Sequence, residues 1–112
     1  MPDDRLAKLE ARYAALRQQL PTVGYLSQGS VYRRPKGRSG NLFTWSTKVA
    51  GHTVSLALSA EQADWLEQAT KEHRRLKRLL TQMHRLSRQI MRARFPSAPR
   101  RRPLNKKVLR LI

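Results

Sequence analysis

Apolar positions near the N-terminus repeat with the period of an α-helix. They follow one another at steps of three and four residues, which places them on one helix face in a heptad-type seam. The seam residues are Leu6, Leu9, Tyr13, Leu16 and Leu20. The pattern predicts a short helix over residues 3–20, which ends at Pro21 because proline cannot continue the hydrogen-bond ladder.

Helical periodicity disappears between residues 21 and 58, where all five glycines of the chain occur. Glycines at this density are typical of turns between short strands. We predict strands at Ser30–Arg34, Leu42–Val49 and Thr53–Leu58, a turn through Pro35–Gly40, and a tight hairpin at Ala50-Gly51-His52. Phe43 and Trp45 alternate along the second strand and share one face, which we expect to be the hydrophobic face of the sheet.

A second helical pattern runs from Ser59 to Phe95, and Ser59 and Gln62 have the spacing of a capping box. The apolar seam of this helix again steps by three and four residues. It consists of Leu66, Ala69, His73, Leu76, Leu80, Met83, Ser87 and Ile90, widened by Leu79 and Leu86. The helix would extend roughly 50 Å, about twice the length of the first. We therefore expect part of its stripe to pack on the sheet or on a second copy of the protein.

These elements predict an α+β fold. A short N-terminal helix, a three-stranded antiparallel β-hairpin sheet and a long C-terminal helix, packed antiparallel on the first, would form a single helix–β-meander–helix domain over residues 1–95. Residues 96–112 contain three prolines and six basic residues. We expect this segment to be a flexible, disordered basic arm.

The distribution of charge indicates what kind of partner the chain has. The 112 residues include 24 Lys and Arg but only 7 Asp and Glu, a formal net charge of +17. No acidic residue follows Glu72, whereas 14 basic residues lie between Arg74 and the C-terminus. A solvated helix face normally mixes both signs, and unrelieved positive charge repels itself unless a polyanion screens it. Nucleic acid is therefore favoured over an anionic membrane surface, an acidic protein or no partner.

Composition disfavours several other classes of function. The chain has no cysteine, which excludes disulfides and thiolate metal sites. Its acidic residues lie near the predicted helix starts, where they complement the helix dipole, and its three histidines lack metal-ligand spacing. We expect no catalytic activity, no metal and no cofactor. No apolar run is long enough to span a membrane, and the N-terminus lacks the apolar segment of a signal peptide. We therefore expect a cytoplasmic, nucleoid-associated protein with no membrane partner.

Three groups of basic residues are the candidate nucleic-acid-binding sites. The tip of the first hairpin carries Arg33, Arg34, Lys36 and Arg38 among small residues that let a backbone approach phosphates. The long helix carries Lys71, Arg74, Arg75, Arg78, Arg85, Arg88 and Arg92, all but Arg75 on one stripe beside the apolar seam. The arm carries Arg100, Arg101, Arg102, Lys106 and Lys107.

Three stretches of the sequence resemble an uncharacterised family of small bacterial proteins that is found beside mobile-element genes. They read GSVYRRPKGRSG, NLFTWSTKVAGHTVSLALSAEQADWLEQ and HRRLKRLLTQMHRLSRQI, and the resemblance covers roughly residues 5–92. Relatives in that family often carry a cysteine knuckle at the first hairpin turn, so in this cysteine-free chain the turn would hold without zinc. The resemblance implies an accessory protein of a mobile element or of recombination, and it assigns no catalytic residue.

The sequence as a whole predicts a non-catalytic nucleic-acid-binding protein. We expect it to bind double-stranded DNA in preference to RNA, as an accessory subunit of a mobile-element transposase, recombinase or RNA-guided nuclease complex. A homodimer or a larger protein complex is expected from the surplus apolar stripe of the long helix. Two alternatives stay open: an RNA-binding subunit of a ribonucleoprotein, and a protein-docking regulator that uses the long amphipathic helix.

Overall fold

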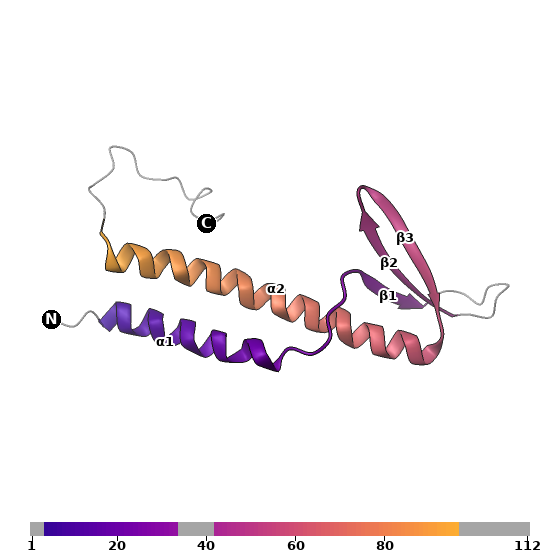
Figure 1. Cartoon of the computed structure of the whole chain (residues 1–112), viewed down its shortest axis with the longest axis horizontal. Helices are drawn as coiled ribbons and strands as arrows, with labels where there is room; N and C mark the ends of the chain where they lie inside the picture. The colour runs from indigo at the N-terminus through magenta and orange to yellow at the C-terminus, as the bar shows by residue number, and fades with distance from the viewer. Residues whose placement is uncertain (1–3, 34–41, 97–112) are drawn as a thin grey trace. The chain divides into compact units, whose positions relative to one another are not determined.

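The computed structural model describes residues 4–33 and 42–96. Helix α1 (Asp4–Gln19) and the 3-10 turn η1 (Leu20–Thr22) are followed by strands β1 (Ser30–Arg33), β2 (Phe43–Val49) and β3 (His52–Leu58) and by helix α2 (Ala60–Arg94) (Figure 1). The predicted α+β fold, with its order of elements and its antiparallel three-stranded sheet, is confirmed. The predicted turn Pro35–Gly40 and the predicted arm beyond Pro96 lie outside the described residues.

Two compact units make up the chain. The helical unit comprises residues 1–22 and 78–112 and holds α1 with the last part of α2. The sheet unit comprises residues 23–77 and holds the three strands with the first part of α2. Helix α2 contributes to both units because it has 35 residues, a length of roughly 52 Å. Within residues 4–33 and 42–96, no helix combines the length and the apolar character needed to cross a membrane.

The sheet of the sheet unit is a meander with strand order β1-β2-β3. Residues that face one another across the strands form rows, and successive rows lie on opposite faces of the sheet. Val31, Trp45 and Leu56 form an apolar row, with the pair Thr47 and Val54 on the same face. Ser30, Ser46 and Ser55 form a hydroxyl row on the other face. One face of the sheet is therefore mainly apolar and the other mainly small and polar.

The connection between β2 and β3 is a two-residue hairpin turn. Val49 pairs with His52, and the residues between them, Ala50 and Gly51, both have positive φ, 49° and 81°. Positive φ at both central positions is what a type I′ turn requires. The predicted tight hairpin is confirmed, and β3 begins at His52, one residue before the predicted start.

The indole of Trp45 connects the sheet to the segment that precedes it. Its Nε1–H donates a hydrogen bond to the carbonyl oxygen of Gln28 at 2.8 Å. The next residue, Gly29, has a φ of 92°, and a Cβ added there would lie 2.7 Å from Trp45 Nε1 and 2.5 Å from the carbonyl oxygen of Ser46. The close approach of indole and backbone therefore requires glycine at position 29. Trp45 and Phe43, expected on the hydrophobic face, are both half-buried.

Helix α2 begins with the capping box that the sequence predicts. The Ser59 N–H donates to Gln62 Oε1 at 2.9 Å, and the Gln62 N–H donates to Ser59 Oγ at 3.2 Å. These two bonds satisfy backbone donors that have no partner inside the helix. The start of the long helix is therefore fixed by local sequence, directly after β3.

The extended segment of residues 23–28 lies along the first part of α2. The Ser27 N–H donates to the carbonyl oxygen of Ala69 at 3.1 Å. The ring centroids of Tyr25 and Trp65 are 5.2 Å apart, and Gly24 lies beside Glu72, since a Cβ added at Gly24 would be 3.9 Å from Glu72 Cγ. This segment covers part of the stripe that the sequence assigned to the sheet or to a second copy.

In the helical unit, α1 and the last part of α2 lie side by side and run antiparallel, as predicted (Figure 1). The core of this unit consists of Leu9 from α1 and of Leu79, Met83 and Leu86 from α2, each at most 7% exposed. The seam predicted through Leu80 and Ser87 is displaced, because Leu80 is 38% exposed and Ser87 is exposed. The row with Leu79 and Leu86 buries two leucines one heptad apart, whereas the row with Leu80 would bury the hydroxyl of Ser87.

Candidate nucleic-acid interface

One face of α2 in the helical unit carries a straight row of arginines. Arg78, Arg85 and Arg92 follow one another at intervals of seven residues, so they lie one above another along the helix. All three are exposed. Each precedes by one residue a position of the buried side of the helix, which places the row away from the core formed by Leu79 and Leu86.

Helix α1 contributes a second basic row, which the sequence analysis missed. Arg5, Lys8 and Arg12 are separated by steps of three and four residues and so share one face of α1. Arg5 lines a cleft of about 280 Å³ together with Arg92 and two uncharged residues of α2. The two rows therefore meet at Arg5 and Arg92, on one side of the helix pair. We call Arg5, Lys8, Arg12, Arg78, Arg85 and Arg92 the basic flank.

The helical unit has few carboxylates that could neutralise this flank. Its described residues, 4–22 and 78–96, include nine Lys and Arg but only two acidic residues, Asp4 and Glu10. Glu10 is engaged by Arg94, whose Nε donates to Glu10 Oε1 at 3.0 Å. The ion pairs Lys71–Glu67, Arg75–Glu72 and Arg94–Glu10 involve none of the three arginines of the α2 row.

Arg88, also predicted to bind nucleic acid, is placed differently from its neighbours on the helix. Its side chain is half-buried, and its Nε is shielded from solvent without a hydrogen-bond partner among the described residues. A shielded donor of this kind is less suited to a phosphate than the exposed guanidinium of Arg85 or Arg92. We therefore place Arg88 outside the basic flank.

The predicted basic residues of the sheet unit lie in a more balanced environment. Lys71 pairs with Glu67 at 3.7 Å, and Arg75 Nε donates to Glu72 Oε2 at 2.9 Å. Arg74 is exposed on α2, and Arg33 is exposed at the end of β1. The described residues of this unit, 23–33 and 42–77, include six Lys and Arg against four acidic residues. The surplus positive charge of the described chain is thus concentrated in the helical unit.

The remaining predicted contacts lie outside the described residues. They are Arg34, Lys36 and Arg38 of the hairpin tip and Arg100, Arg101, Arg102, Lys106 and Lys107 of the arm. Of the predicted residues that the structure describes, Arg78, Arg85 and Arg92 form the basic flank together with Arg5, Lys8 and Arg12, which were not predicted. The signal for the added residues was present in the sequence, since α1 repeats basic residues with the same helical step as α2.

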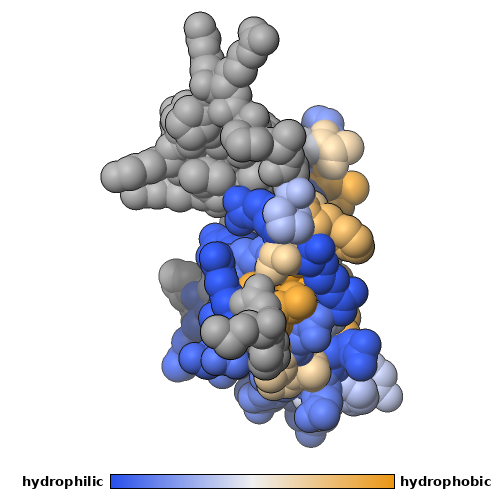
Figure 2. Space-filling view, turned by 90° about the vertical axis from the view of Figure 1, so that its left-hand side faces the viewer, coloured by the Kyte–Doolittle hydropathy of each residue, from blue (hydrophilic) through white to orange (hydrophobic). Residues whose placement is uncertain are grey.

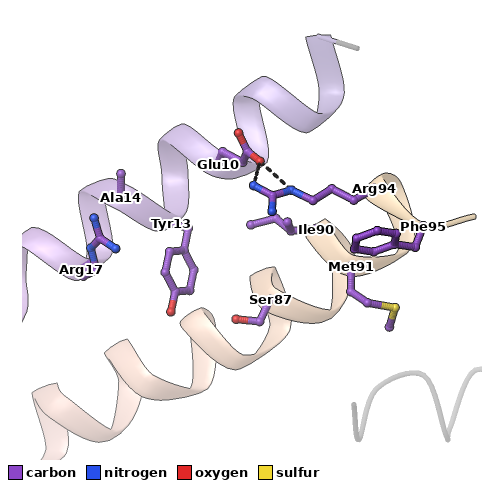
Figure 3. A pocket seen from close by; sticks show the side chains of 9 residues that line it. All are labelled: Glu10, Tyr13, Ala14, Arg17, Ser87, Ile90, Met91, Arg94 and Phe95. Atoms are coloured by element: carbon purple, nitrogen blue, oxygen red, sulfur yellow. Dashed lines mark hydrogen bonds and ion pairs between the residues drawn. The ribbon is translucent and has the colours of Figure 1, made fainter. Parts of the chain in front are cut away.

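The helical unit also carries an apolar groove, of about 440 Å³, between its two helices. Tyr13 points from α1 toward α2 near Ser87, while Met91 and Phe95 lie at the end of α2 (Figure 3). Met91 and Phe95 are 50% and 70% exposed. Viewed from the end where α1 begins and α2 ends, hydrophilic side chains flank a narrow strip of apolar ones (Figure 2). The unit therefore has a charged flank and an apolar groove, two surfaces of different chemistry.

Known proteins do not supply a relative for this arrangement: no protein-family model, curated protein or solved structure matches the chain. The resemblance to a mobile-element-associated family therefore stays a prediction. In the part of the chain that the structure describes, no three His, Asp or Glu side chains gather as metal ligands would. What this surface can do chemically is to present fixed positive charge and guanidinium hydrogen-bond donors to an anionic partner.

Proposed function

We propose that this protein binds nucleic acid, with double-stranded DNA preferred to RNA, and that it does so without catalysing a reaction. The basic flank is the observation that carries this proposal. Its like charges repel one another in the free protein, since the helical unit holds nine Lys and Arg against two acids among its described residues. A phosphate polymer converts this repulsion into attraction and releases its own condensed counterions on binding.

The spacing of the arginine row suits contact along a phosphate backbone. Arg78, Arg85 and Arg92 lie about 10 Å apart in succession, so the row is roughly 21 Å long. One strand of duplex DNA presents a phosphate about every 3.4 Å along the axis, so the row spans about six phosphates. Guanidinium groups bind phosphate oxygens through paired N–H donors. Contacts of this kind position a protein on DNA and do not read its sequence.

The proposed biological role is that of an accessory subunit of a mobile-element transposase, recombinase or RNA-guided nuclease complex. This role is supported by the resemblance of the three sequence stretches described above. In the cell, we propose that the protein lies in the cytoplasm, associated with the nucleoid. It would act there as a homodimer or within a larger protein complex. The apolar groove beside Met91 and Phe95 supports the alternative of a docking regulator, because exposed apolar surface of this kind is suited to a protein partner.

The proposal is tested by the salt dependence of duplex binding, measured by fluorescence anisotropy on a labelled DNA of arbitrary sequence. The test variant replaces Arg78, Arg85 and Arg92 with Gln. If each contacts one phosphate, the slope of log K against log salt becomes shallower by about 2.7. The matched control replaces Lys71, Arg75 and Arg94 with Gln, because these three are paired with carboxylates but carry the same total charge. We expect the control to change the slope by much less.

Equal losses in the two triple variants would contradict the basic flank as the interface, since net charge alone would then explain binding. Competition between duplex DNA and structured RNA decides between the two nucleic acids. Displacement of the labelled duplex by lower concentrations of RNA than of unlabelled DNA would favour the ribonucleoprotein alternative. A protein that binds neither polymer at low salt would leave the docking regulator as the better account.

A further inference from the structure

Strand β3 forms an edge of the three-stranded sheet, and its own seven residues lack the sequence features that normally prevent pairing. All residues from His52 to Ala57 are exposed. The strand reads HTVSLAL, without Lys, Arg, Asp, Glu or Pro, and its register with β2 runs without a bulge from Leu58 to His52. Proteins normally block such edges with charges, prolines, bulges or short strands. The opposite edge, β1, has these features: it has only four residues and ends in Arg33.

The hairpin geometry shows which backbone groups of β3 face outward. Val49 and His52 close a two-residue turn, so they form a hydrogen-bonded pair, and hydrogen-bonded pairs recur at every second residue of an antiparallel ladder. Val54 and Leu56 therefore bond to β2. The N–H and C=O groups of Thr53, Ser55 and Ala57 point away from β2, and no hydrogen bond joins them to other described residues.

We propose that β3 pairs with β3 of a second copy of this chain, antiparallel and centred on Ser55. In this register Ser55 faces Ser55 of the second copy, Thr53 faces Ala57, and Val54 faces Leu56. Three pairs in this register, Ser55–Ser55, Thr53–Ala57 and Ala57–Thr53, consist of residues whose N–H and C=O groups point outward. Each of these pairs exchanges two hydrogen bonds, so the two strands form about six in all. The same register places all seven residues of each strand opposite a residue of the other, and a two-fold axis passes between the two Ser55 residues.

The side chains favour the same register. Val54 and Leu56, 43% and 55% exposed, lie on the apolar face. Their pairing across the new junction would join the two apolar faces into one six-stranded sheet, while the hydroxyl row of Ser30, Ser46 and Ser55 would continue on the other face. A shift by one residue would place the apolar side of one strand beside the polar side of the other. A second copy of β3 therefore pairs with the outward N–H and C=O groups of this edge. It also places apolar side chains beside apolar ones on one face and polar side chains beside polar ones on the other.

The charge distribution disfavours this pairing less at the sheet unit than elsewhere. Each copy carries +17 in total, but residues 23–77 hold nine Lys and Arg with four acidic residues, whereas the rest of the chain holds 15 with three. A pair of seven-residue strands buries less than a standard protein interface, so we expect a weak dimer with a dissociation constant above about 10 μM. Salt screens the repulsion between copies. Dimerisation should therefore strengthen with added salt, whereas binding to nucleic acid should weaken. Because the two equilibria respond to salt in opposite directions, a failure of the dimer proposal can be distinguished from a failure of the proposed nucleic-acid binding.

Sedimentation equilibrium of the full chain measures the dissociation constant from about 0.05 M to about 0.5 M salt. The test variant is Ser55→Lys, which places two ammonium groups opposite each other at the two-fold axis. The matched control is Ser30→Lys, the same substitution in the same row of the sheet but on the β1 edge. We expect Ser55→Lys to raise the dissociation constant roughly tenfold or more and Ser30→Lys to leave it nearly unchanged. A mixture of Ser55→Lys and Ser55→Glu chains should associate again, which also shows that the variants are folded.

A covalent readout is available because the chain has no cysteine. The Cα atoms of a hydrogen-bonded antiparallel pair lie about 5.5 Å apart, within the range that a disulfide bridges. Oxidised glutathione should therefore link Ser55→Cys chains into dimers much faster than Ser30→Cys chains. The proposal is overturned if the protein stays monomeric at submillimolar concentration and high salt, if Ser55→Lys chains still dimerise, or if both cysteine variants cross-link equally.

Discussion

Arg94, the last residue of α2, donates through Nε to Glu10 Oε1 of α1 at 3.0 Å, although the two residues are 84 positions apart in the sequence. Both side chains are about half exposed, 53% and 41%. Ion pairs at this exposure stabilise a protein by about 0.2–1 kcal/mol. The importance of this pair lies in its position, because Figure 3 shows it at the rim of the apolar groove, where it joins α1 to the end of α2.

Replacement of Glu10 by Gln should lower the free energy of unfolding by about 0.5 kcal/mol, measured by urea denaturation at low salt. The loss should shrink in about 1 M salt, because the ionic part of the interaction is screened. Glu67→Gln is the control, since it removes a pair with Lys71 within one helix, at 3.7 Å. A Glu10→Gln loss above about 2 kcal/mol would mean that the carboxylate does more than hold Arg94.

The displaced seam of α2 leads to a second prediction. Leu86 is 4% exposed and Leu80 is 38% exposed, although both lie on the predicted apolar stripe. Leu86→Ala should destabilise the helical unit by about 2–4 kcal/mol, because it leaves a cavity between the helices. Leu80→Ala should cost less than about 1.5 kcal/mol, since it removes less buried surface. Thermal denaturation followed by circular dichroism at 222 nm compares the two, and a reversed order would restore the seam predicted from the sequence.

Alanine substitutions at the two glycines with positive φ distinguish the cost of backbone strain from the cost of a steric clash. At Gly51 (φ 81°) no atom lies within 4 Å of an added Cβ, so Gly51→Ala should cost only the backbone term, about 1–2 kcal/mol. At Gly29 (φ 92°) the Cβ would also meet the carbonyl oxygen of Ser46 at 2.5 Å. Gly29→Ala should therefore cost at least about 1 kcal/mol more and change the near-ultraviolet circular dichroism of Trp45. Similar costs for the two variants would show that the strands adjust around position 29.

The capping box provides a test of the start of α2. Ser59→Ala removes the oxygen that accepts the Gln62 N–H bond, and it should cost about 1 kcal/mol. Ser87→Ala is the control, because Ser87 is an exposed serine inside the same helix, where alanine should be neutral or slightly stabilising by a few tenths of a kcal/mol. Equal effects in urea denaturation would mean that helix propensity, and not the cap, determines the result.

The features that the sequence predicted correctly depend on neighbours in the chain. The capping box of Ser59 and Gln62, the end of α1 before Pro21 and the turn at Ala50 and Gly51 are each specified within about four residues. Local signals of this kind act in the same way whatever surrounds them. They therefore determine the order and type of the elements. The predicted boundaries of the described elements differ from those of the structure by no more than one residue.

The features that the sequence analysis missed depend on how elements pack. Periodicity shows that Leu79 and Leu80 both lie near the apolar stripe, but only the fit against Leu9 and its neighbours selects the row that is buried. The same fit decides which side of α1 stands beside Arg92, and hence that Arg5 joins the basic flank. Residues far apart in sequence, such as Glu10 and Arg94, come together as a consequence of that packing and leave no local pattern.

A last prediction concerns the relation between the hairpin tip and the basic flank in binding. Replacement of Arg33, Arg34, Lys36 and Arg38 by Ala should make the salt slope of duplex binding shallower by up to about 3.6, if each residue contacts one phosphate. The flank variant at Arg78, Arg85 and Arg92 should change it by about 2.7. If both regions contact the same duplex at once, the slope changes should add in the combined variant, to about 6.

A combined variant no weaker than the flank variant alone would remove the hairpin from the interface. The opposite result, with all the loss in the hairpin variant, would remove the flank.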